Sequence, residues 1–175
     1  MTEEQPELNQ ELVLTIELIP ETAWNENLRK YLPTWEWDRI RKGVYQRNGY
    51  RCEICNAPGK LNCHEVWSYD DELSIQKLAG FLALCNKCHG VKHFGFMEVL
   101  SRQGKVDLDE VVEHFLEVNQ VGYKEFRKHL SEQTRIWRQR SEVSWSLDMG
   151  KYGMRLWKDE AEKYIKKKRG KEEKS

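Results

Sequence analysis

Apolar residues recur with helical spacing in three stretches of the chain. The stretches cover residues 35–48, 108–118 and 122–140. A repeat of about 3.6 residues puts apolar side chains on one face of a helix, so we predict three amphipathic helices here. Thr34 and Asp107 precede the first two stretches, and both residue types commonly cap a helix N-terminus.

Shorter apolar runs predict extended segments and two further helices. Strands are expected over residues 12–19, 61–67, 80–84 and 143–149. Short helices are expected over residues 22–32 and from Cys88 to about Phe94. No internal repeat is present, and residues 155–169 have helical propensity without an apolar face. The pattern as a whole predicts an α+β protein.

The overall composition argues against a membrane or secreted protein. Only 39% of the residues are hydrophobic, 33% are charged, and the mean hydropathy is −0.83. No apolar run approaches the roughly 20 residues that a membrane-spanning helix needs. Residues 1–12 are mostly Glu, Gln and Asn, unlike a signal peptide. We therefore expect a cytoplasmic protein without a membrane partner.

The net charge of zero hides a strong regional asymmetry. Residues 1–28 contain seven Glu and no Lys or Arg, whereas residues 29–60 contain eight basic and three acidic residues. Residues 151–175 contain ten basic and five acidic residues. Two basic zones in a neutral chain are compatible with nucleic acid as a partner. The residues expected to contact phosphates are Arg39, Lys42, Arg47, Arg51, Lys92, Lys166, Lys167, Lys168 and Arg169.

Four of the five cysteines form two matched CxxC pairs. Cys52 pairs with Cys55, and Cys85 pairs with Cys88. A CxxC turn presents two thiolates to one ion, and two such turns complete the tetrahedral four-cysteine shell of a structural zinc. Disulfide bonds are disfavoured because thiols stay reduced in the cytosol. We therefore expect one structural Zn²⁺ ion.

Three histidines lie near these cysteine pairs. His64 falls on the predicted strand 61–67, and His89 directly follows the last cysteine of the second pair. His93 comes four residues after His89, so both side chains lie on one helix face and can chelate one ion. The chain therefore contains ligand-type residues beyond those of the zinc site.

The segment 52–93 resembles the HNH endonuclease (ββα-metal) superfamily, in particular compact bacterial and phage members with a helical extension. The resemblance rests on the two CxxC pairs, on Cys63-His64-Glu65 and on His89-x3-His93. It implies a treble-clef zinc finger in which a knuckle, a β-hairpin, a second knuckle and a helix follow one another. The implied segments are a disordered acidic N-terminus (1–10), an N-terminal strand with helices (11–50), the finger (51–97), a helical extension (105–150) and a basic tail (151–175).

The resemblance also implies an activity, namely metal-dependent hydrolysis of nucleic-acid phosphodiester bonds, with double-stranded DNA as the expected substrate. His64 corresponds to the general base that activates water. His89 and then His93 correspond to ligands of one catalytic divalent cation, which would be Mg²⁺, Mn²⁺, Ni²⁺ or Zn²⁺. Imidazole suits the role of base because its pKa is near neutral. The zinc ion held by the four cysteines cannot act as this catalytic cation, since four thiolates leave no open coordination position.

Positions near His64 leave alternatives open. Cys63 is either a further ligand of the catalytic cation or a buried packing residue. Glu65 is either another ligand or an exposed strand residue. Gly80 or Phe81 stands where the family has its middle Asn, which braces the hairpin loop under the base. The residues that could take over this bracing role are Asn62 and Asp70.

A competing function is a catalytically inactive zinc-finger module that binds nucleic acid or a protein partner. A protein partner would dock on the acidic N-terminus or on the helical extension. The three histidines favour the nuclease, whereas the missing middle Asn favours the module.

Overall fold

The computed structural model describes residues 11–24 and 26–153. Within these residues the chain forms seven helices and one three-stranded sheet, so the prediction of an α+β protein is confirmed. The strands are β1 (Leu61–Asp70), β2 (Ile75–Cys85) and β3 (Ser146–Asp148). The helices are η1 (Glu21–Ala23), α1 (Leu28–Tyr31), α2 (Thr34–Arg47), α3 (Asn86–Lys92), α4 (Phe94–Arg102), α5 (Leu108–Asn119) and α6 (Tyr123–Ser141).

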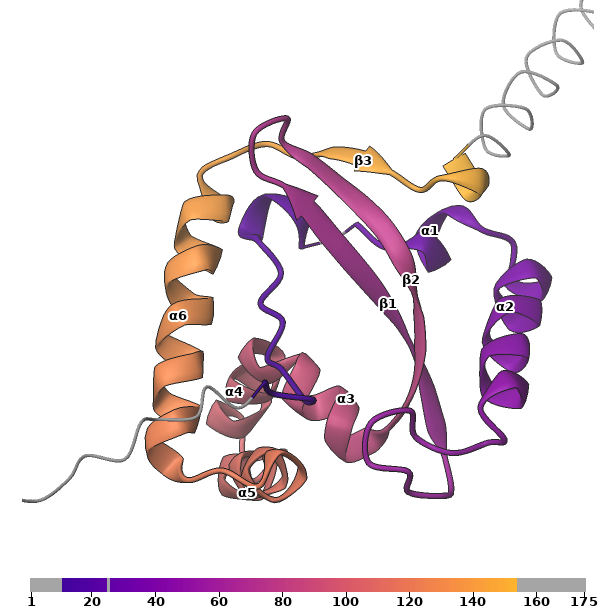
Figure 1. Ribbon diagram of the computed structural model, residues 1–175. Helices are drawn as coiled ribbons and strands as arrows, with labels where there is room; N and C mark the ends of the chain where they lie inside the picture. The colour runs from indigo at the N-terminus through magenta and orange to yellow at the C-terminus, as the bar shows by residue number, and fades with distance from the viewer. Residues whose placement is uncertain (1–10, 25, 154–175) are drawn as a thin grey trace, which may run out of the picture.

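A long β-hairpin lies at the centre of the fold. Strand β1 pairs antiparallel with β2, and the short β3 pairs with β2 in parallel. Both hairpin strands are longer than predicted, because pairing continues past a register shift in β1 as far as Asp70 opposite Ile75. Asp70 then closes the turn, where its carboxylate accepts two backbone N–H groups. Helix α2 lies on one side of the hairpin and α3 to α6 lie on the other (Figure 1).

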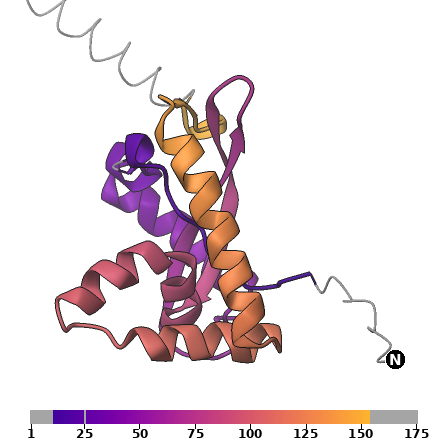
Figure 2. The same cartoon turned by 90° about the vertical axis from the view of Figure 1, so that its left-hand side faces the viewer.

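Residues 11–20, here called the N-terminal thread, do not form the predicted strand. The thread runs between α6 and the hairpin and passes behind α6 in Figure 2. Side chains take the place of a strand partner. The Asn119 amide bonds the backbone N–H and C=O of Leu14 at 3.0 and 2.9 Å, and a ring nitrogen of His129 accepts the N–H of Ile16 at 2.9 Å. Leu14 and Ile16 are buried, so the apolar run reflects burial and not strand pairing.

Two predicted helical regions are interrupted. Region 22–32 contains only η1 and the single turn α1, whose N-cap Asn27 accepts a backbone N–H. The helix expected from Cys88 begins earlier, at Asn86, and breaks at His93. A further helix that the sequence pattern does not predict, α4, follows directly.

The three long helices match their predictions. Helices α2, α5 and α6 agree with the expected ranges to within one residue at each end, and β3 lies inside the predicted strand 143–149. Asp107 caps α5, as expected, by accepting a backbone N–H at 2.9 Å. Thr34, in contrast, is the first residue of α2, and Pro33 stands at the N-cap without a side-chain hydrogen bond.

One core joins the thread, the hairpin and the helices that follow it. Its members include Leu14, Leu84, Val91, Phe115 and Phe126. The expectations for residues 1–10 and 155–169 lie outside the described residues. Among the described residues, no helix is both long and apolar enough to cross a membrane.

Replacement of Asn119 by Ala should destabilise the fold by about 2–4 kcal/mol. It leaves the N–H and C=O of buried Leu14 without partners, and each unmade buried hydrogen bond costs about 1–3 kcal/mol. Urea unfolding measures the change. Gln139→Ala, which removes an exposed amide on α6, is the control and should change stability by less than about 0.5 kcal/mol. A loss below about 1 kcal/mol for Asn119→Ala would contradict the anchoring role.

Candidate metal centres

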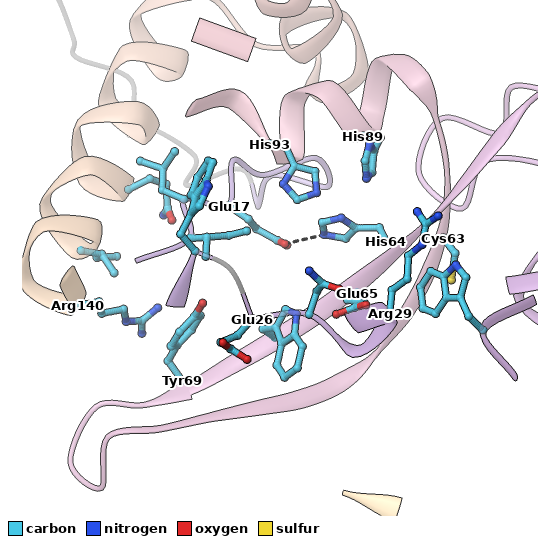
Figure 3. Close-up of a pocket in the computed structure, with 18 residues that line it drawn as sticks. Glu17, Glu26, Arg29, Cys63, His64, Glu65, Tyr69, His89, His93 and Arg140 are labelled. Atoms are coloured by element: carbon cyan, nitrogen blue, oxygen red, sulfur yellow. Dashed lines mark hydrogen bonds and ion pairs between the residues drawn. The ribbon is translucent and has the colours of Figure 1, made fainter. Parts of the chain in front are cut away.

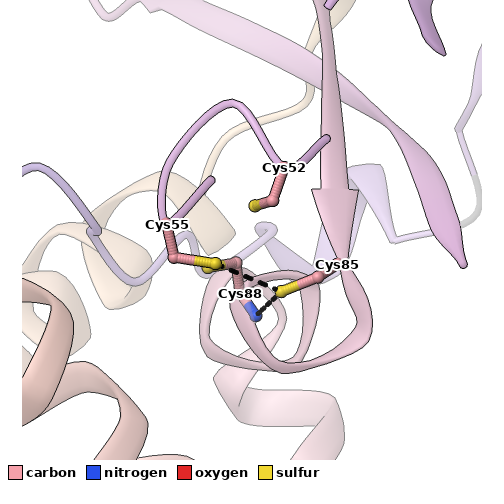
Figure 4. A group of neighbouring side chains, drawn as sticks. All are labelled: Cys52, Cys55, Cys85 and Cys88. Atoms are coloured by element: carbon pink, nitrogen blue, oxygen red, sulfur yellow. Dashed lines mark hydrogen bonds between the residues drawn. The ribbon is translucent and has the colours of Figure 1, made fainter. Parts of the chain in front are cut away.

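The four paired cysteines come together, as their spacing predicts. Their sulfur atoms lie within 4.8 Å of one another, and Cys55 Sγ is 3.6 Å from Cys85 Sγ (Figure 4). Four sulfurs bound tetrahedrally at a Zn–S length of about 2.3 Å lie about 3.8 Å apart, whereas a disulfide requires about 2.05 Å. Cys52, Cys55, Cys85 and Cys88 therefore form a site that can hold a metal ion such as zinc.

Two tight turns hold these cysteines in position. In the first turn, the backbone N–H of Cys52 donates to the carbonyl of Ala57 at 3.0 Å, and Asn56 adopts a left-handed φ of 59°. In the second turn, Cys85 is the N-cap of α3, and its sulfur accepts the backbone N–H of Cys88 at 3.4 Å. Local backbone geometry thus fixes each pair.

The electrostatics of the cysteine cluster favour a bound cation. Burial raises the pKa of the Cys52 thiol, but hydrogen bonds from nearby backbone N–H groups lower it to about 7. Burial, followed by the charges of Cys52 and Cys85, raises the pKa of Cys88 far above its ordinary value. Four thiols cannot ionise together without a positive ion among them. His114 on α5 adds a contact behind the cluster, with Nε2 at 3.1 Å from Cys88 Sγ.

Three histidines form a second group of ligand-type side chains. His64 comes from β1, His89 from α3, and His93 from the break between α3 and α4. One ring nitrogen of each lies within 4.8 Å of the others, and the ring centroids are 4.6–5.5 Å apart. The four-residue spacing predicts the pairing of His89 with His93, and the hairpin brings His64 to them.

Glu17 on the N-terminal thread joins the histidine group. One carboxylate oxygen lies 2.8 Å from His64 Nε2 and the other lies 2.6 Å from Lys92 Nζ. Burial raises the pKa of Glu17, but the hydrogen bond from His64 and the charge of Lys92 outweigh burial and lower it to about 2. Glu17 is therefore ionised at neutral pH and accepts the Nε2–H of His64.

Lys92 is not available to a phosphate group, and its prediction as a nucleic-acid contact is wrong. The residue is only 6% exposed. Its ammonium bonds the Glu17 carboxylate and, at 2.9 Å, the Thr15 hydroxyl, because α3 turns this side chain toward the thread. A buried ammonium requires such a partner, so Lys92 stabilises the contact between α3 and the thread.

The histidines have the protonation state that a metal requires. Burial, followed by the charge of His64, lowers the pKa of His89 to about 4. Burial, followed by the charges of His89 and His64, lowers the pKa of His93 to about 3. Both rings are neutral at pH 7, the form in which imidazole binds metals. His64 Nδ1 is buried without a hydrogen-bond partner among the described residues, which marks it as a position for a ligand or reactant.

The histidine group lines a pocket of about 440 Å³ beside β1. Figure 3 shows His64, His89 and His93 together, with Glu17 next to His64. Arg29 also lines the pocket and extends from α1 toward the histidines (Figure 3). Four further aromatic side chains line the pocket, namely Trp24, Trp37, Trp67 and Tyr69. The pocket therefore combines metal-ligand, basic and aromatic groups.

Two neighbours of His64 do not join the group. The Glu65 carboxylate accepts the backbone N–H of Leu28 at 3.1 and 3.0 Å, which anchors α1 and Arg29 to β1. Cys63 lines the same pocket, but its sulfur is not grouped with the histidine nitrogens. Burial, followed by the charge of Glu65, raises the pKa of the Cys63 thiol to about 12. Cys63 is thus a partly buried residue of the pocket wall outside the histidine group. Glu65 is not a grouped ligand either, and its role is to anchor α1.

Neither candidate replacement for the missing Asn contacts His64. The Asn62 amide donates to Asn86 Oδ1 at 2.8 Å, and Asp70 closes the hairpin turn. Glu17, 47 residues away in the sequence, supplies the hydrogen bond to His64 instead. The sequence reasoning missed Glu17, although a carboxylate inside the apolar run of the thread was a usable signal.

The other predicted phosphate contacts within the described residues are exposed. These are Arg39, Lys42 and Arg47 on α2 and Arg51 after it. The Arg39 side chain is 64% exposed, and Arg47 reaches the Phe81 carbonyl at 3.2 Å. The three on α2 give this helix a basic face, on which Arg39 pairs with Glu36 and Arg47 with Glu53. Lys166, Lys167, Lys168 and Arg169 lie outside the described residues.

Comparisons of the chain with protein-family models, with curated proteins and with solved structures give no match. The resemblance of the cysteine and histidine motifs to a known superfamily therefore rests on the residues themselves. The geometry of the two clusters is the basis for a functional proposal.

Replacement of Cys85 by Ser should abolish zinc binding at the cysteine cluster and unfold the finger. Zinc binding contributes on the order of 10 kcal/mol to folding in small fingers, and it needs all four thiolates. Cys63→Ser is the matched control, because it removes a thiol outside the cluster and should keep the zinc. Native mass spectrometry and thermal melting measure both effects. Metal-free wild-type protein that remains folded would contradict the zinc assignment.

Proposed function

We propose that the protein is a metal-dependent nuclease that hydrolyses nucleic-acid phosphodiester bonds at the histidine group. The observation that carries the proposal is the meeting of His64, His89, His93 and Glu17 in one pocket. The chain order of cysteine pair, hairpin, cysteine pair and helix supports a treble-clef finger of the HNH type.

His89 and His93 would hold the catalytic cation. Both are neutral at pH 7 and share one face of α3 and its end. Imidazole is a donor of intermediate softness, so Zn²⁺ or Ni²⁺ suits the pair better than Mg²⁺ or Mn²⁺. A cation bound there supplies positive charge to the scissile phosphate and to the departing oxygen.

His64 serves as the general base in this proposal. Because Glu17 accepts its Nε2–H, the neutral ring keeps its lone pair on Nδ1, the atom without a partner. The attacking water gives its proton to Nδ1, and the Glu17 carboxylate stabilises the imidazolium that forms. Lys92 holds Glu17 in position by its ion pair.

Basic side chains bind the substrate backbone. The Arg29 guanidinium reaches into the same pocket and can make paired hydrogen bonds to a phosphate. The basic face of α2 adds contacts that do not depend on sequence and that weaken as salt rises. Together they bring a phosphodiester to the histidine group.

The alternative function is a zinc-binding module without catalysis. Its support is the burial of His64, which is 3% exposed and lies within 4.8 Å of both other histidines. In that case His64 is a third ligand of a structural ion, and the module binds nucleic acid or a protein without cutting.

Substitution of His64 by Ala separates the two functions. In the nuclease, cleavage should fall roughly 10²–10⁴-fold while the cation at His89 and His93 stays bound, because a general base acts on water. His89→Ala should also lose cleavage, but through loss of the cation, so added metal should partly restore it. Plasmid nicking with Mn²⁺, Ni²⁺, Zn²⁺ or Mg²⁺, together with the metal content of each variant, provides the measurement.

Two results would contradict the nuclease. One is wild-type protein that cuts no nucleic acid with any of these cations. The other is a His64→Ala variant that loses the second metal ion, which identifies His64 as a ligand and supports the binding module.

A further inference from the structure

A second pocket, of about 500 Å³, adjoins the histidine pocket. It lies between the N-terminal thread, α4 and α6. The two pockets share Glu17, Leu18, Ile19, Trp24 and His93. The second pocket is therefore a direct neighbour of the histidine group, within reach of a further part of a molecule bound there.

Two aromatic rings of the second pocket are exposed. Trp24 is 50% exposed and lines both pockets, and Phe96 on α4 is 44% exposed. Large apolar side chains usually lose exposure when the chain folds, so two open rings in one pocket indicate a flat apolar ligand. Nucleobases are such ligands, and they stack on aromatic side chains.

The polar groups of the second pocket carry an excess of negative charge. Glu17, Glu21 and Glu98 lie in its lining with one cation, Arg102. Three carboxylates repel a phosphate, whereas a carboxylate accepts hydrogen bonds from the amino group of a base. The first pocket also contains three carboxylates, but it has two arginines, Arg29 and Arg140, and the histidine group that would hold a cation. A phosphate therefore fits the first pocket better, and a base fits the second.

We propose that the second pocket binds an unpaired base of the strand whose phosphodiester lies at the histidine group. The proposal rests on the nuclease function and replaces the expected duplex substrate by a single-stranded or locally unpaired one. A base inside a duplex is stacked on its neighbours and has no free face for Trp24, so only an unpaired base can occupy this pocket.

The test measures binding of a 12-nucleotide DNA strand that contains 2-aminopurine, and of its duplex, in the His64→Ala background that prevents cutting. The single strand should bind at least tenfold more tightly, with quenching of the fluorescent base. Trp24→Ala should weaken single-strand binding about 5- to 150-fold, which corresponds to about 1–3 kcal/mol per stacked base. Phe96→Ala is the second variant and should act in the same direction.

Tyr123→Ala is the control, because Tyr123 is an aromatic residue 58% exposed at the start of α6 and lines neither pocket. Its single-strand affinity should stay unchanged. Duplex binding as tight as single-strand binding would overturn the inference, as would Trp24→Ala and Phe96→Ala variants that bind as Tyr123→Ala does. The latter result would indicate that the second pocket binds a protein segment and not a base.

The inference and the nuclease function can fail separately. If wild-type protein cleaves duplex DNA and Trp24→Ala does not change the cleavage rate, the base-pocket inference is wrong and the nuclease function stands. Tight, Trp24-dependent binding of single strands without cleavage by wild type supports the base pocket and overturns the nuclease.

Discussion

The carboxylate of Glu17 is the contact on which the rest of the site depends. It binds the Lys92 ammonium at 2.6 Å and the His64 ring at 2.8 Å, and so joins the N-terminal thread, α3 and β1. Without it, Lys92 would be a buried cation with no carboxylate partner, which costs several kcal/mol. His64 would also lose the acceptor that fixes its ring. One side chain therefore stabilises the packing of the thread and orients a residue of the site.

Helix α3 links the cysteine cluster to the histidine group. Cys88 belongs to the cysteine cluster and the next residue, His89, belongs to the histidine group. A structural ion at the four cysteines would fix the start of α3 against β2, and this sets the direction of the helix face that carries His89 and His93. The cysteine cluster would thus position the helix that carries His89 and His93, and the hairpin adds His64 from β1.

Local patterns in the sequence predict the parts of this arrangement that depend on local geometry. The CxxC spacing leads to the cysteine cluster, the four-residue spacing to His89 with His93, and helical periodicity to α2, α5 and α6. What the sequence does not predict depends on contacts between distant residues. The apolar run of the thread predicts a strand. In the structure, however, its backbone forms hydrogen bonds with the side chains of Asn119 and His129. The sequence predicts Lys92 as an exposed basic residue, because its carboxylate partner, Glu17, lies 75 residues away along the chain.

The most direct test of the central claim is the cleavage rate of the double variant Glu17→Gln/Lys92→Met. It removes both members of the buried ion pair, so no unpaired charge is left inside, and the glutamine oxygen still accepts the His64 hydrogen bond. If Glu17 stabilises the charged form of His64, single-turnover cleavage should fall about 10- to 100-fold, with the fold and the cation at His89 and His93 retained. Cleavage at the wild-type rate by a folded, metal-loaded double variant would contradict the account.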